Sequence, residues 1–295
     1  MKTKIHFIVN PIAGSGKNHF TEDFLYKYFE ESEFEIRVKE SEYSKHAITL
    51  ANESIKENVN VLVACGGDGT INEVASCIVN SEIILGVIPI GSGNGLASNL
   101  NIPKKINKAL QTIIHANFIS IDVGKINNQL FFSNTGIGFG AQVIYEFEKS
   151  KKRKLISYIS SVFKALKNYT YNNVLELTIN GETKTVYPFL FFISNSNEMG
   201  YNMSLTPKAS LQDGLLDVIC APKLSRFKIL LFGVLFLFKK HSWLKEAHCF
   251  QAKKLHIQKH DNTFFSAQKD GESIVIKSDS LEINIIPKAL KVYIP

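Results

Sequence analysis

The chain has 295 residues, of which 45% are hydrophobic and 21% charged, a composition that argues against intrinsic disorder of the whole chain. This length fits two ordinary domains or one large domain. The 34 basic and 27 acidic side chains give a net charge of +7, which favours anionic partners without choosing among them.

The first 120 residues alternate between strand-like and helix-like patterns. Short apolar runs predict buried strands over residues 5–9, 59–65 and 83–90. Apolar residues recur at helical spacing in residues 20–28, 47–55 and 73–79. Strand, glycine-rich loop and helix in repetition predict an amino-terminal three-layer α/β domain with a parallel sheet, over residues 1–121.

After about residue 121 the pattern becomes that of antiparallel β-structure. Leu175, Leu177 and Ile179 alternate with polar residues, and Asn180-Gly181 then predicts a tight hairpin turn. We therefore expect a β-sandwich domain over residues 122–286, with helices near 156–166 and 227–238 and a tail, 287–295, that returns to the first domain. The most apolar segment, 229–238, is about half the roughly 20 residues that a membrane-spanning helix needs, so no membrane span is predicted.

Three glycine-rich loops follow the predicted strands of the first domain, at residues 10–16, 66–70 and 91–94. The carboxyl ends of parallel strands are where open α/β sheets bind ligands, and glycine lets backbone N–H groups approach a phosphate. The P-loop spacing fails around Gly16-Lys17, and the dinucleotide fingerprint fails at Leu96. One such loop alone would be interpreted as a tight turn. Three together, one of them carrying Asp68, predict a phosphate site.

Five motifs carry a resemblance to a known family. They are Asn10-Pro11, Gly66-Gly67-Asp68-Gly69-Thr70 with Asn72-Glu73, Gly91-Ser92-Gly93-Asn94, Asp213-Gly214-Leu215-Leu216-Asp217 and Asp270-Gly271-Glu272. In this order they resemble the diacylglycerol kinase catalytic domain family, which includes bacterial soluble lipid kinases and is related to sphingosine and ceramide kinases. The resemblance covers essentially the whole chain, although the second motif alone is shared with NAD kinases and phosphofructokinases.

The resemblance implies transfer of the γ-phosphate of ATP to a lipid hydroxyl, such as that of diacylglycerol or a sphingoid base, with Mg²⁺. It also implies a set of residues that line the nucleotide. These are Asn10, Pro11, Ile12, Ala13, Gly14, Ser41, Gly66, Gly67, Asp68, Gly69, Thr70, Ile71, Asn72, Glu73, Gly91, Ser92, Gly93 and Asn94.

The resemblance assigns Glu272 as the general base that takes the lipid hydroxyl proton, with Asp270 beside it to hold metal or water. Asp68 is expected to act on Mg²⁺, directly or through water, and is a rival for the role of base. On spacing alone, Asp270-Gly271-Glu272 would be a hairpin turn.

A structural Mg²⁺ site is implied by the resemblance at the Asp213 side chain and the backbone carbonyls of Ser210 and Leu215. An ordinary Asp-Gly turn is an equal alternative. Gly95 stands where bacterial diacylglycerol kinases commonly have aspartate, which weakens the choice of diacylglycerol as acceptor.

A kinase acting on lipid implies peripheral contact with an anionic membrane surface, at the inner face of the cytoplasmic membrane. Candidates for this contact are the basic residues in 149–154 and those that flank the apolar segment 229–238, namely Lys223, Arg226, Lys228, Lys239 and Lys240. The alternatives are a solvated charge run and a buried helix. A homodimer is also considered, and nucleic acid is not expected as a partner. The alternatives in function are an NAD kinase-like phosphotransferase and a catalytically silent nucleotide- or lipid-binding module.

Overall fold

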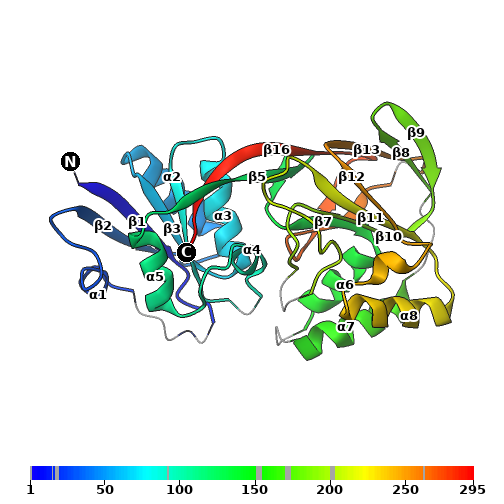
Figure 1. Ribbon diagram of the computed structural model, residues 1–295, viewed down its shortest axis with the longest axis horizontal. Coiled ribbons are helices and arrows are strands. Elements are labelled where there is room, and N and C mark those ends of the chain that lie inside the picture. Colours follow the sequence, from blue (N-terminus) through cyan, green and yellow to red (C-terminus); the bar gives the residue numbers. More distant parts are fainter. Residues whose placement is uncertain are drawn as a thin grey trace. The chain divides into compact units, whose positions relative to one another are not determined.

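The computed structural model describes residues 2–14, 16, 20–91, 93–150, 155–169, 174–199, 203–261 and 263–295. The chain divides into two compact units (Figure 1). Unit 1 comprises Met1–Asp122 together with Lys288–Pro295, and unit 2 comprises Val123–Pro287. The predicted class, an α/β domain followed by an antiparallel β-domain, is confirmed.

Unit 1 is built on a parallel sheet in the order β2-β1-β3-β4-β16. Its strands are β1 (Thr3–Val9), β2 (Phe34–Glu40), β3 (Val61–Gly66), β4 (Ile84–Pro89) and the last residues of β16 (Ser280–Tyr293). All six residues of β3 are buried, as expected for a central parallel strand that is covered on both faces. Val292 of β16 is in register with Leu85 of β4, so the end of the chain completes this sheet.

The helices of unit 1 are α1 (Glu22–Leu25), α2 (His46–Lys56), α3 (Asp68–Ile78), α4 (Gly95–Asn99) and α5 (Ile106–Ile114). The helices α2 and α3 pack against each other and against β1, β3 and β4, whereas α5 packs against β4. Ala47 and Ala51, whose spacing with Ile55 predicted this helix, are buried together with Leu50.

Two helix predictions need correction. The aromatic residues of segment 20–28 do not build a long helix, because α1 ends at Leu25 and the rings of Phe20, Phe24 and Tyr28 instead pack edge to face. The helix predicted over 73–79 begins five residues earlier, at Asp68. A carboxylate in the first turn is favoured by the partial positive charge at a helix amino terminus, so the second glycine motif opens the helix as well as forming a loop.

Unit 2 contains two antiparallel sheets. One holds β5 (Phe118–Ile126), which begins in unit 1, β6 (Gln129–Phe131), β8 (Leu175–Ile179), β9 (Glu182–Val186), β13 (Lys254–Lys259) and the first part of β16. The other has the order β12-β11-β10-β7-β14-β15, formed by β7 (Asn134–Gly138), β10 (Pro188–Ser194), β11 (Leu216–Pro222), β12 (His248–Ala252), β14 (Phe265–Lys269) and β15 (Glu272–Ile276). The α-helices of the described residues in this unit are α6 (Phe139–Glu148), α7 (Leu155–Asn168) and α8 (Arg226–Leu237), and a short 3₁₀ helix spans His241–Trp243.

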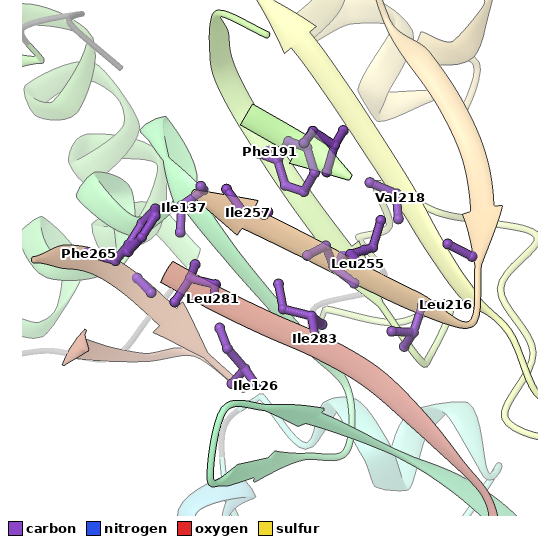
Figure 2. Close-up of a cluster of buried hydrophobic side chains, with 14 of the residues drawn as sticks. Ile126, Ile137, Phe191, Leu216, Val218, Leu255, Ile257, Phe265, Leu281 and Ile283 are labelled. Atoms are coloured by element: carbon purple, nitrogen blue, oxygen red, sulfur yellow. The ribbon is translucent and has the colours of Figure 1, made fainter. Parts of the chain in front are cut away.

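The core of unit 2 lies between the two sheets. Figure 2 shows Phe191 and Val218 of one sheet facing Leu255 and Ile257 of the other, and all four side chains are buried. The turn between β8 and β9 is Asn180-Gly181, with φ angles of 51° and 85°, as the sequence predicted for a tight hairpin. Among the helices of the described residues, none is long and apolar enough to cross a bilayer.

We expect Phe191→Ala to lower the free energy of unfolding by about 3–5 kcal/mol, because it opens a cavity between the two sheets. Denaturant unfolding followed by circular dichroism measures this loss. Val275→Ala is the matched control, since Val275 is 62% exposed, and its effect should stay within about 0.5 kcal/mol. Equal losses in the two variants would contradict a core at Phe191.

Candidate functional site

The three glycine-rich loops of unit 1 meet at the carboxyl edge of the parallel sheet, because β1, β3 and β4 are neighbours there. Asn10, directly after β1, donates its backbone N–H to the Cys65 carbonyl at 2.9 Å and its side-chain amide to Thr70 Oγ1 at 3.3 Å. A Cβ added to Gly91 would lie 2.5 Å from the Cα of Gly67. The second and third loops therefore touch through glycine, at a distance that no side chain allows.

The carboxylate of Asp68 joins the second loop to the third. Its Oδ2 accepts the Asn94 N–H at 2.8 Å, and its Oδ1 accepts the Gly95 N–H at 2.8 Å. Asn94 has a φ of 55°, and its side-chain amide donates to the Gly91 carbonyl at 2.6 Å. Burial raises the pKa of Asp68, and the backbone N–H groups oppose that shift. Asp68 therefore fixes the conformation of the third loop.

The first loop lies as close to the start of the third loop as the second loop does. Gly14 has a φ of 66°, and a Cβ placed on it would lie 2.6 Å from the Ile90 carbonyl oxygen. The Ile12 side chain is 84% exposed at the tip of the same loop. The remaining described positions expected to line the nucleotide, Pro11, Ala13, Gly66, Gly69, Ile71 and Gly93, fall in these loops or in the first turn of α3.

Three of the expected nucleotide residues lie at the margin of this group. Ser41 follows β2 and donates its N–H to the Val9 carbonyl at 2.8 Å, which places it at the same edge of the sheet. Glu73 accepts the Lys45 N–H at 3.2 Å, and so ties α3 to the loop before α2. Asn72 lies beside Glu73 on α3. Ser92 falls outside the described residues, as do residues 151–154 of the basic run.

The donor atoms at the meeting point of the loops fit a divalent cation that arrives with phosphates. The described residues contain no group of three or more His, Cys, Asp or Glu side chains that could hold a metal ion alone. Asp68 supplies a carboxylate, and Asn94 Oδ1 is buried without a hydrogen-bond partner among the described residues. Mg²⁺ is commonly held by one or two carboxylates together with substrate phosphates, so Asp68 would supply the carboxylate and a bound nucleotide the phosphates.

The segment expected to hold a structural ion forms a local turn. The exposed Asp213 accepts the Leu215 N–H at 3.0 Å through Oδ1, and Ser210 Oγ accepts the Gln212 N–H at 3.3 Å. These hydrogen bonds are typical of the ordinary Asp-Gly turn that the sequence analysis gave as the alternative. Ion binding by Ser210, Asp213 and Leu215 stays a prediction.

In unit 2, Asp270 and Gly271 form the two-residue turn between β14 and β15, with φ angles of 48° and 82°. The Asp270 carboxylate accepts three backbone N–H groups, from Phe132 at 2.9 Å, Ser133 at 2.7 Å and Asn134 at 3.0 Å. Burial raises the pKa of Asp270 to about 6, although these N–H groups favour the ionised form. Asp270 thus anchors the turn to residues 132–134, where β7 begins.

Glu272 is the first residue of β15, and its side chain is exposed. Within the described part of the chain, no hydrogen bond or ion pair engages its carboxylate. The next residue, Ser273, donates its N–H to Glu148 Oε1 at 2.8 Å, at the end of α6. The sequence did not predict that Glu148 and the N–H groups of residues 132–134 would contact this turn. Neither belongs to a motif, and a backbone N–H group is the same in every residue type that has one.

The chain joins an α/β domain, whose three glycine-rich loops meet at one edge of its sheet, to a β-sandwich that carries the exposed carboxylate of Glu272. Residues 4–126 match the family model of the diacylglycerol kinase catalytic domain, and residues 134–294 match that of the YegS C-terminal NAD kinase beta sandwich-like domain. Diacylglycerol kinases of Staphylococcus aureus, from strains bovine RF122 / ET3-1 and MRSA252, are each 33% identical over 230 residues, which is 76% of this chain and 72% of theirs.

A crystal structure of a diacylglycerol kinase from Bacillus anthracis str. Sterne superposes with a TM-score of 0.78 at 22% identity, covering 99% of this chain and 97% of that one. At this identity the likeness concerns the fold. The matches to the catalytic domain and to the Staphylococcus aureus enzymes show the family. The chain belongs to the diacylglycerol kinase family, and it is a phosphotransferase with an alcohol acceptor.

We expect Asp270→Asn to change how stability depends on pH. Because folding raises the pKa of Asp270 from 3.8 to about 6, its contribution to stability is greatest below pH 4 and is lost as pH rises through 6. The unfolding free energy of the native chain minus that of the variant should therefore fall by roughly 1–3 kcal/mol between pH 4 and pH 7. Chemical denaturation at several pH values measures this difference.

Asp261→Asn is the control with the opposite sign. Hydrogen bonds from Thr263 lower the pKa of Asp261, so the difference between native chain and variant should rise, and not fall, with increasing pH. A pH-independent difference for Asp270→Asn would contradict the burial of that carboxyl group.

Proposed function

We propose that the protein is an ATP-dependent lipid kinase, which transfers the γ-phosphate of ATP to the hydroxyl of diacylglycerol or of a related lipid such as a sphingoid base. The observation that carries this proposal is the meeting of three glycine-rich loops around Asp68 at one edge of the parallel sheet. Membership of the diacylglycerol kinase family supports the choice of ATP as donor and lipid as acceptor.

The phosphates of ATP would bind at this edge. Glycine at positions 14, 67 and 91 leaves the backbone uncovered, so that N–H groups can be directed at phosphate oxygens. The amino terminus of α3 begins at the same place and adds a partial positive charge. Mg²⁺ bound with the nucleotide would neutralise charge on the phosphates, with Asp68 and Asn94 as its candidate oxygen ligands.

Glu272 is the candidate general base. Its carboxylate would take the proton of the lipid hydroxyl while the lipid oxygen bonds to the γ-phosphorus and the bond from phosphorus to the bridging oxygen of ADP breaks. The products are the phosphorylated lipid, ADP and a proton held on Glu272, which is then released to water. Such a reaction depends mainly on positioning, and the fixed turn at Asp270 holds β15, on which Glu272 lies.

The hydrogen bonds favour Glu272 over Asp68 as the base. Both carboxylate oxygens of Asp68 already accept backbone N–H groups, whereas the carboxylate of Glu272 is exposed and engaged by no described residue. We assign Asp68 to loop positioning and cation binding, and Glu272 to proton transfer.

The second candidate function is phosphorylation of NAD. Two observations favour it, namely the Gly66-Gly67-Asp68-Gly69-Thr70 motif and the match of unit 2 to a domain described as NAD kinase beta sandwich-like. A nucleotide- or lipid-binding module without turnover is the remaining alternative.

Transfer of radiolabel from ATP to a panel of acceptors, with Mg²⁺ present, tests these functions. The panel contains diacylglycerols, sphingoid bases, ceramide and NAD. We expect labelled lipid, and Glu272→Gln should lower kcat by about 10²–10⁴-fold with little change in the KM for ATP, since the variant lacks only the base. Asp68→Asn should also raise the KM for ATP, because an amide NH₂ would face a backbone N–H.

Glu182→Gln is the matched control, since Glu182 is exposed on β9 and should leave kcat unchanged. Labelled NAD without labelled lipid would replace the lipid kinase with an NAD kinase. Binding of ATP without transfer to any acceptor would indicate the module without turnover. A normal kcat in Glu272→Gln would reject Glu272 as the base.

Gly91→Ala tests the contact between the loops. The added Cβ would lie 2.5 Å from Gly67 Cα, so the loops must separate, and we expect ATP affinity to fall at least tenfold in isothermal titration. Gly233→Ala is the control, because a Cβ at that position would lie within 4 Å of nothing except its chain neighbours and the backbone of its own helix. Unchanged ATP affinity in Gly91→Ala would remove this loop from the nucleotide site.

A further inference from the structure

The helix α8 of unit 2 is apolar on both its buried and its exposed side. Ile229, Phe232 and Phe236 pack against a buried cluster that includes Leu190 and Phe192 of β10. On the opposite side a second apolar stripe faces solvent, here called the α8 patch. It consists of Phe227, Leu230, Leu231, Val234, Leu237 and Phe238, which are 74%, 67%, 37%, 46%, 75% and 70% exposed.

The spacing of the α8 patch follows the helix. Positions 227, 230, 231, 234, 237 and 238 recur every three or four residues, so they form one continuous face. In a surface helix this face is normally polar. Large contiguous apolar patches on a surface mark contact with a membrane or a protein partner.

The charges that flank the α8 patch in the sequence are mainly basic. Residues 218–245 contain five lysines and one arginine and no Asp or Glu. Lys228 is paired with Glu246, while Lys223, Lys240 and Lys245 are exposed around the patch. Lys240 Nζ lies 4.4 Å from the ring centroid of Trp243, which is itself 68% exposed. Apolar, tryptophan and lysine side chains together are the composition of a helix that lies in a membrane interface.

We propose that the α8 patch is the surface by which the protein enters the interface of an anionic bilayer. The inference rests on the proposed function only where it connects this contact with a lipid acceptor. The exposure and charge of α8 do not depend on that function. The apolar stripe would enter the boundary between headgroups and acyl chains, and the lysines would lie among anionic headgroups. A second copy of the chain is disfavoured as occupant, because pairing two such surfaces would bring like charges together.

Trp243 makes the proposal directly measurable, because it is the single tryptophan of the chain. Vesicles of phosphatidylglycerol should shift its fluorescence to shorter wavelength, and vesicles of phosphatidylcholine should shift it much less. The double variant Leu230→Gln/Leu237→Gln should lose most of the shift and at least tenfold in vesicle affinity. Both side chains are exposed, so circular dichroism should show an unchanged fold.

Charge is tested by co-sedimentation with the same vesicles, since changing Lys240 would alter the surroundings of Trp243. Lys239→Gln/Lys240→Gln should weaken binding several-fold. Lys104→Gln/Lys105→Gln removes the same charge from exposed positions in unit 1 and should bind nearly as the native chain does. Equal losses in the two lysine pairs, or binding indifferent to Leu230→Gln/Leu237→Gln, would overturn the proposal.

Self-association is the competing outcome. A concentration-dependent dimer in analytical ultracentrifugation that Leu230→Gln/Leu237→Gln abolishes, without vesicle binding by the native chain, would assign the patch to a second copy and overturn the proposal.

Activity on a short-chain diacylglycerol dissolved as monomers separates the membrane-surface proposal from the lipid kinase proposal. Loss of activity on vesicles alone in the patch variant supports the membrane surface, whereas vesicle binding without transfer to any lipid would reject the kinase and leave the surface in place.

Discussion

The site in unit 1 depends on one carboxylate. Asp68 opens α3 and accepts the backbone N–H groups of Asn94 and Gly95, so the end of β3 and the loop after β4 are held as one structure. Asn94 adopts a positive φ, and Gly91 lies against Gly67 where no Cβ would fit. If this carboxylate were lost, the hydrogen bonds that hold Asn94 and Gly95 against the start of α3 would be lost with it.

Unit 2 uses the same device at a different turn. Asp270 accepts the N–H groups of Phe132, Ser133 and Asn134, and thereby fixes the turn that precedes Glu272. In both units an Asp-Gly pair holds a distant segment of backbone in place, and the acid does so by accepting N–H groups. Glu272, whose carboxylate is exposed beside this second turn, is the residue that we propose as the proton acceptor.

The sequence predicted most of the architecture because its signals are local. Buried runs at residues 59–65 and 83–90 became β3 and β4, and Asn180-Gly181 became the predicted hairpin turn. It erred where tertiary contacts overrode spacing. Phe20, Phe24 and Tyr28 recur at helical intervals, yet α1 has only four residues and includes only Phe24, and the three rings pack edge to face.

The sequence by itself determined the two kinds of domain, the order of the glycine motifs and the presence of acids within them, since periodicity and turn chemistry are read from neighbouring residues. It could not decide what those acids contact. The partners of Asp68 lie 26 and 27 residues away, and those of Asp270 lie 136 to 138 residues away, all of them backbone N–H groups. A backbone N–H group does not depend on residue type, so no sequence pattern identifies these partners. Only the tertiary structure shows which segment each aspartate holds.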